Sequence, residues 1–148
     1  MDSNENTPNF EVISKRPDDW ADKTMIIYSH VTAQSEDGLA PNVVITRDAM
    51  GTGESFTDYV NRQLGVLQEQ MPEFKLINRR KGKISAKTAS DISCSWQSPL
   101  AKLQQRVVYI SMGQGRIVCF VATARDDNFE DHISTFNEVL TSIGIEEI

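Results

Sequence analysis

The side chains that most often carry out catalysis are few in this sequence and stand far from one another. Its two histidines, His30 and His132, belong to no metal-binding pattern such as HExxH. The two cysteines, Cys94 and Cys119, form no CxxC pair, and each lies in an apolar stretch where cysteine usually behaves as a small hydrophobic residue. We therefore expect structural histidines, unreactive thiols and no metal site.

The glycine-rich segment and the carboxylates also lack the spacing that catalysis requires. Gly51-Thr52-Gly53 is not followed by a third glycine at the dinucleotide-binding spacing. These glycines are explained as the loop before a helix that is predicted to begin after the capping residue Ser55. No nucleophile elbow or Walker A loop is present, and Asp and Glu are scattered over turns and predicted helix faces. The sequence thus predicts a protein that has no catalytic residues, binds no cofactor and is not an enzyme.

One basic cluster contrasts with the acidity of the chain. Arg79-Arg80-Lys81-Gly82-Lys83 has no aromatic residues between its cations, which favours a solvated hairpin turn over a nucleic-acid site. The whole chain carries 15 Lys and Arg against 21 Asp and Glu, a formal net charge of −6. This balance argues against nucleic acid as a partner and against direct insertion into a membrane.

Glutamines interrupt the apolar pattern at two places. Gln63 lies beside the apolar stripe of a predicted helix, and Gln104-Gln105-Arg106 begins an otherwise apolar strand. These groups can simply face water, which spacing alone favours. Alternatively, a glutamine amide lines an apolar groove and pairs with polar groups of a bound chain, because a buried amide without a partner is costly.

The hydrophobic pattern predicts short strands and two amphipathic helices. One helix is expected to begin after Ser55, a capping residue, and to have ended by Pro72; the second begins near Asp127. Short connections such as Gly113-Gln114-Gly115 predict antiparallel neighbours in an α+β fold with the order β-β-β-α-β-β-β-β-α. The predicted strands comprise residues 10–13, 24–31, 42–47, 74–78, 88–96, 103–112 and 116–123.

Two of these strands are apolar on both faces. Val107 to Ile110 and Ile117 to Ala122 are continuous hydrophobic runs, as in strands that are covered on both sides. Two helices cover only part of such a sheet. We therefore expect a further partner for the remainder, either a second subunit or a bound apolar segment.

The length of 148 residues corresponds to one domain, expected over residues 9–148 after a polar, disordered tail at residues 1–8. The first residues are acidic and polar, unlike a signal peptide, and no apolar run approaches the roughly 20 residues of a membrane span. These features predict a cytoplasmic location.

Several short patterns, in their order and spacing, resemble one known family. They are Trp20-x-Asp22-x-Thr24-Met25-x-Ile27, Val44-Ile45-Thr46-Arg47-Asp48, Phe56-x-Asp58-Tyr59-Val60-x-Arg62-Gln63-Leu64, Pro72-x-Phe74-Lys75-Leu76 and Val118-x-x-x-x-Thr123. In this combination the sequence resembles the DcrB-related proteins and, more narrowly, the Eag-type adaptor chaperones of bacterial type VI secretion. The likeness extends from Phe10 to Ile143.

This resemblance implies a fold like those of Mog1 and PsbP, a twisted antiparallel sheet flanked by two main helices. It further implies a homodimer with a concave apolar surface. That surface would hold the hydrophobic N-terminal helices of a PAAR-containing secreted effector before export, without a cofactor.

The resemblance also assigns residues to that groove. Met25 and Ile27 match strand residues that face it, and Gln63 matches a glutamine on the first helix. A second family glutamine falls on Val107 when positions are counted from Trp96, whereas Gln105 lies two residues earlier on the same face of the strand. We predict that the client-binding site consists of Met25, Ile27, Gln63, Gln105 and Val107.

Two hypotheses remain open on sequence grounds. The first is the secretion chaperone. The second is a small-ligand-binding or enzymatic α+β domain whose pocket lies on the same sheet. For Met25 and Ile27 the competing interpretation is an ordinary place in the hydrophobic core.

Overall fold

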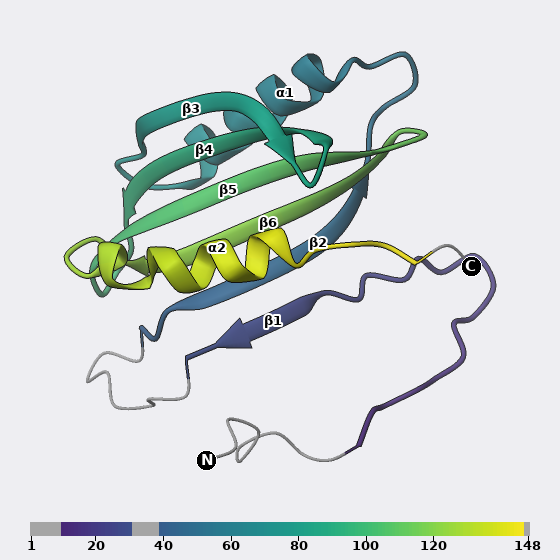
Figure 1. Ribbon diagram of the computed structural model, residues 1–148, viewed down its shortest axis with the longest axis horizontal. Coiled ribbons are helices and arrows are strands. Elements are labelled where there is room, and N and C mark those ends of the chain that lie inside the picture. The colour runs from purple at the N-terminus through teal and green to yellow at the C-terminus, as the bar shows by residue number, and fades with distance from the viewer. Residues whose placement is uncertain (1–9, 31–38, 147–148) are drawn as a thin grey trace.

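The structure, a computed structural model, describes residues 10–30 and 39–146. These residues form one antiparallel sheet with the strand order β1-β2-β6-β5-β4-β3 (Figure 1). The predicted tail at residues 1–8 lies outside the described residues. The strands are β1 (Ile26–Ser29), β2 (Asn42–Ala49), β3 (Lys75–Ile84), β4 (Lys87–Gln97), β5 (Lys102–Gly113) and β6 (Arg116–Arg125).

Two α-helices accompany the sheet, α1 (Phe56–Gln70) and α2 (Ile133–Thr141), the latter preceded by a short 3-10 helix η2 (Phe129–His132). The start of α1 follows the predicted cap, because Ser55 Oγ accepts a hydrogen bond of 3.1 Å from the backbone N–H of Asp58. None of the described helices combines the length and the apolar character needed to cross a membrane.

The α2 face of the sheet carries the larger apolar core. Phe129 and Phe136 pack at 5.4 Å between ring centroids and, with Leu140, cover buried side chains of the central strands. Because side chains alternate along a strand, every second residue of β5 and β6 points to this face. The buried strand residues of this core are Val43, Ala89, Val108, Ile110, Met112, Val118, Phe120, Ala122 and Ala124.

The opposite face is covered by α1. Tyr59 and Val60 of this helix pack on Ile92, Val107 and Tyr109, with the rings of the two tyrosines edge to face at 5.6 Å. Figure 1 shows α1 beside β3 and β4 rather than over β1 and β2. The α1 face is therefore closed over one half of the sheet and more open over the other.

The α+β class and the antiparallel pairing predicted from sequence are confirmed. The hairpin at Gly113-Gln114-Gly115 joins β5 to β6, and the runs Val107–Ile110 and Ile117–Ala122 are buried or half-buried on both faces. The antiparallel pairing was predicted from the short connections, and the burial of these two strands from their continuous apolar runs.

Three local predictions were wrong. Residues 10–13 form no strand, because no other described strand lies alongside them, and they belong to an extended segment that leaves the sheet (Figure 1). The predicted strand at residues 24–31 is limited to Ile26–Ser29 within the described range. The basic cluster at residues 79–83 lies within edge strand β3 rather than in a turn, and the turn itself falls at Ser85 and Ala86, both with positive φ.

Candidate functional site

A groove of about 370 Å³ lies between α1 and the sheet, on the face that α1 covers incompletely. Its sheet side contains Val107 of β5 and Val121 of β6, and its helix side contains Leu67. Its polar side chains are the amides of Gln63, Gln70 and Gln105 and, on the β2 side, Thr46, Arg47 and Asp48. Apolar walls with several amides and two charged groups at one side suit a ligand that is mostly hydrophobic and carries isolated polar groups.

Gln105 has one satisfied and one unsatisfied end. Its Nε2 donates a hydrogen bond of 3.0 Å to Thr123 Oγ1 on β6, which fixes the amide in the groove wall. Gln105 is only 9% exposed, and its Oε1 has no hydrogen-bond partner among the described residues. A buried acceptor left unpaired costs about 1–3 kcal/mol, so this atom is poised to accept a donor from a ligand.

The two positions that competed for the family's second glutamine lie in the same groove. Gln105 and Val107 are two apart on β5 and line it together with Gln63. The interpretation favoured by spacing, in which Gln105 faces water, is wrong for this residue. Although Val107 stands where the family has its second glutamine, an amide is therefore present on the same strand face in this groove.

Ile27 lies on the α1 face of the sheet too, but outside the groove. It pairs with Val44 of β2, which pairs with Val121 of β6, which pairs with Val107 of β5. Cross-strand partners share a face of a sheet, so these four residues form an apolar row. Ile27 is 59% exposed, and the alternative placing it in the hydrophobic core is wrong.

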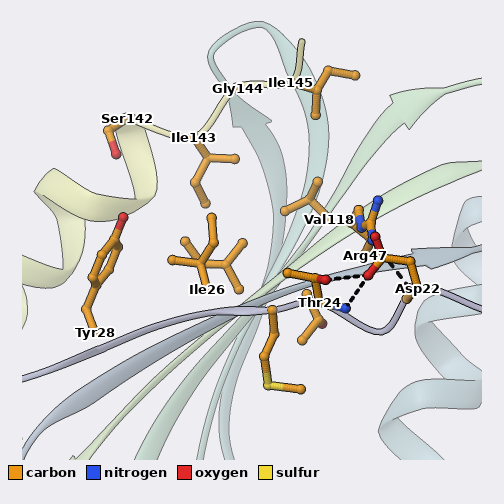
Figure 2. Close-up of a pocket in the computed structure, with 13 residues that line it drawn as sticks. Asp22, Thr24, Ile26, Tyr28, Arg47, Val118, Ser142, Ile143, Gly144 and Ile145 are labelled. Carbon is orange, nitrogen blue, oxygen red and sulfur yellow. Dashed lines mark hydrogen bonds and ion pairs between the residues drawn. The ribbon is translucent and has the colours of Figure 1, made fainter. Parts of the chain in front are cut away.

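Met25 is placed differently. It precedes β1, is 48% exposed, and lines a second cavity of about 430 Å³ beside β1. Figure 2 shows Ile26, Val118 and Ile143 around this cavity, below the C-terminal segment that follows α2. The structure thus brings Gln63, Gln105 and Val107 together, puts Ile27 on the same sheet face, and places Met25 at the other cavity.

An ion pair and hydrogen bonds lie at the edge of the second cavity. Arg47 forms an ion pair of 3.2 Å with Asp22 at its edge, and Thr24 donates its backbone N–H to the Asp22 carboxylate at 2.8 Å (Figure 2). The hydrogen bonds from Thr24, and then the contact with Arg47, lower the pKa of Asp22 to about 2. This carboxylate is therefore ionised at any physiological pH.

Charged and phenolic groups at the N-terminal half of α1 have structural partners. Tyr59 donates its hydroxyl to Asp48 Oδ2 at 2.5 Å, and burial followed by this contact raises the pKa of Tyr59. Arg62 binds the Glu54 carboxylate through two hydrogen bonds of 2.9 Å and lies over the Tyr59 ring. These contacts anchor α1 on the edge of the groove.

The two cysteines are buried or half-buried, and the two histidines contact each other. Burial raises the pKa of the Cys94 thiol to about 11 and that of Cys119 to about 12, so both stay protonated near neutral pH. His30 and His132 meet edge to face, with ring centroids 5.9 Å apart, a proximity not predicted from sequence. Within residues 10–30 and 39–146, no three His, Cys, Asp or Glu side chains gather closely enough to hold a metal ion.

Several groove residues were not predicted from sequence. Val121 and Leu67 complete its apolar walls, and Thr123 orients Gln105. Thr123 is part of the pattern that carries the family resemblance, and this was the one available signal. The others look like ordinary residues of a strand or helix, because their role depends on where α1 stops covering the sheet.

Known proteins match the chain over most of its length. The family model described as DcrB matches residues 15–142. This chain belongs to the DcrB family. A curated protein of Pseudomonas aeruginosa named effector EagT6 is 31% identical over 111 residues, which cover 75% of this chain and 76% of that protein. The predicted membership of the family, with a likeness to its Eag-type proteins, is therefore confirmed.

Solved structures confirm the predicted fold. A protein of unknown function from Pseudomonas aeruginosa, PA94, aligns with a TM-score of 0.75 and 25% identity over 90% of each chain. The cyanobacterial PsbP of Synechocystis aligns with a TM-score of 0.51 and 12% identity over 82% of each chain. The Ran-binding protein Mog1p of Saccharomyces cerevisiae aligns with a TM-score of 0.51 and 10% identity over 80% of this chain and 70% of its own. The last two show a shared fold alone.

Proposed function

We propose that this chain is a non-catalytic adaptor chaperone of type VI secretion. In this proposal it acts in the cytoplasm as a homodimer and shields the hydrophobic N-terminal helices of a PAAR-containing effector before export. The observation that supports it most directly is the apolar groove containing the unpaired Oε1 of Gln105. The relationship to EagT6 supports the same class of protein.

The open part of the α1 face has dimensions suited to a helix. The open part of the apolar row runs from Ile27 of β1 to Val121 of β6, because Val107 of β5 is 1% exposed beneath α1. Neighbouring strands lie about 4.8 Å apart, so the open row is about 10 Å wide, and an α-helix with its side chains is about 10–12 Å in diameter. A membrane helix placed there would exchange contact with water for contact with side chains, which reduces its tendency to aggregate.

The glutamines would provide recognition in addition to burial. Helices that associate in membranes carry small residues and isolated Ser, Thr or Asn side chains, which form hydrogen bonds across their interfaces. Gln105 Oε1 can accept a hydrogen bond from such a group, and Gln63 on α1 adds a second amide at the same groove. A client helix with a polar side chain facing the groove would then be preferred over a uniformly apolar one.

Co-purification with the N-terminal fragment of a candidate effector tests this function. Ile27→Asp should abolish co-purification, because a carboxylate facing an apolar helix is penalised by several kcal/mol. Met25→Asp tests whether the site extends to the cavity beside β1, and Gln63→Ala should weaken binding by about 1 kcal/mol. Leu100→Asp is the matched control, since Leu100 is 65% exposed in the β4–β5 connection.

The competing function, a ligand-binding or enzymatic domain, is addressed by the same assay. His132→Ala and Cys119→Ala should retain the effector fragment if the thiol and imidazole have no chemical role. Thermal unfolding checks that each variant is folded. A folded Ile27→Asp protein that still retains the fragment at the wild-type level would contradict the groove assignment.

A further inference from the structure

The segment before β1 is an extended arm with exposed hydrophobic side chains. Phe10, Val12, Ile13 and Trp20 are between 69% and 91% exposed. In Figure 1 the arm runs from β1 past the C-terminal segment and then away from both faces of the sheet. Single exposed hydrophobic residues are common, but four within one short segment mark a surface that binds something.

The arm is attached at its base and not at its tip. Among the described residues, its polar contacts with the sheet come from Asp22, which forms the ion pair with Arg47 and accepts a hydrogen bond from Arg47 Nη2 through its carbonyl. Arg16 donates to the carbonyl oxygens of Pro17 and Trp20, which are residues of the arm itself. The apolar tip is thus held out by a fixed base and remains available to another surface.

A matching surface lies on β1 and beside it. Among the described strands, β1 pairs with β2 alone, so its other edge has backbone groups without a neighbouring strand. The cavity of about 430 Å³ lies next to this edge, with Ile26, Ile45 and Ile145 in its walls. An added strand could form backbone hydrogen bonds with the edge and place every second side chain in the cavity.

We propose that the arms are exchanged between two copies of this chain. Residues 10–13 of one copy lie as a strand along the β1 edge of the other, and Phe10 and Val12, which alternate with Glu11, enter its cavity. This inference deepens the proposed homodimer by naming its interface. It also accounts for a sequence that has the pattern of a strand and yet pairs with none of the strands that the structure describes in its own chain.

The area that such an exchange would bury approaches that of a stable pair. An aromatic side chain buries roughly 150–250 Å², so Phe10 removes about this area from each arm, and Val12 and the backbone of residues 10–13 add to it. Counted over two arms and over the surface that they cover on the partner, the total approaches the lower end of the range of about 1,200–2,000 Å² in which specific protein interfaces lie. Each copy gives its arm to the other and receives the other's arm on its own β1 edge, so the two contacts are related by a two-fold axis.

The mass of the purified chain in sedimentation equilibrium is the first test, and no effector is needed. The wild type should sediment at twice 16.6 kDa at micromolar concentration. The double variant Phe10→Asp/Val12→Asp should shift to 16.6 kDa, with the dimer dissociation constant raised at least about 100-fold. Its fold should be intact, because both side chains are exposed in the single chain. Leu100→Asp is the control and should keep the wild-type mass.

Disulfide capture separates exchange from an arm that folds back on its own chain. A tagged chain with Val12→Cys is mixed with an untagged chain with Ile145→Cys, both lacking Cys94 and Cys119. Exchange predicts a disulfide-linked pair of one tagged and one untagged chain, and Leu100→Cys in place of Ile145→Cys should give none. The proposal would be overturned by a monomeric wild type or by a Phe10→Asp/Val12→Asp variant that stays dimeric. It would also be overturned if a chain with both Val12→Cys and Ile145→Cys formed its disulfide solely within itself. Effector binding is measured separately, so a failed exchange leaves the chaperone function to its own assay.

Discussion

Two neighbouring residues of β5, which point to opposite faces of the sheet, differ in whether their polar atoms are hydrogen-bonded within the protein. On β5, Arg106 points to the α2 face, where Asp91 accepts hydrogen bonds from its Nη2 at 2.7 Å and its Nε at 3.1 Å, and Asn137 contacts its Nη1. Gln105, the residue before it, points to the α1 face and keeps its Oε1 unpaired. Arg106 is thus paired within the protein, whereas Gln105 keeps an acceptor without a partner.

The apolar residues follow the same division. Phe120 of β6 is fully buried under α2, whereas the next residue, Val121, is half-buried in the groove wall. Residues of the closed core and residues that line the proposed client groove thus alternate along a single strand. Binding sites commonly retain such locally suboptimal features, since removing them improves stability at the expense of function.

The largest expected effect compares Phe120 with Val121. Phe120→Ala should lower the free energy of unfolding by about 3–5 kcal/mol, because it opens a cavity in a closed core. Val121→Ala should cost about 1 kcal/mol or less, because its side chain already contacts an open groove. Urea denaturation followed by circular dichroism measures both. Equal losses would show that the two faces do not differ in packing.

A smaller effect of opposite sign is expected at Gln105. Gln105→Leu removes the unpaired acceptor and should leave the free energy of unfolding unchanged or raise it by about 1 kcal/mol. The same variant should weaken retention of the effector fragment. Gln68→Leu, at an exposed position of α1, is the matched control and should change neither quantity appreciably. If Gln105→Leu is destabilised, Gln105 supports the fold rather than the client.

The smallest effect concerns pH and the anchor of α1. The hydrogen bonds from Arg62, then that from the Gly51 backbone, lower the pKa of Glu54 from 4.5 to about 2. Because the folded pKa is the lower one, the contribution of Glu54 is fully present above pH 4.5 and is lost as the pH falls towards 2. The difference in unfolding free energy between wild type and Glu54→Gln should therefore vanish over this interval. A difference that stays constant from pH 6 to about pH 2 would contradict this contact.

Much of the fold was predictable because strongly apolar strands and a capped helix are local signals. The errors occurred where long-range pairing decides the outcome. Cations at residues 79–83 suggested a turn, but an edge strand tolerates them because its side chains reach water. Residues 10–13 have the alternation of a strand, but a strand also needs a neighbour, and none of the described strands of this chain supplies one.

The site was harder to predict than the fold. Gln63 and Val107 were assigned through the family resemblance, and the structure brings them into one groove. The burial of Gln105 depends on the β5–β6 register, which sets Thr123 opposite it, and on the position of α1 above it. Neither is visible in the spacing of the residues along the chain, which is why a solvent-facing glutamine was the expected outcome.

The basic cluster on β3 has a consequence for how large an assembly this protein can form. At one end of the sheet β3 presents Arg80, Lys81 and Lys83 as exposed cations, so two such edges repel each other on approach. The opposite end, β1, is apolar and uncharged. Growth through one edge alone stops once that edge is occupied. In the proposed arm exchange, a chain with one apolar and one cationic edge would form closed pairs rather than filaments, which would suit a chaperone whose apolar groove stays open until its client binds.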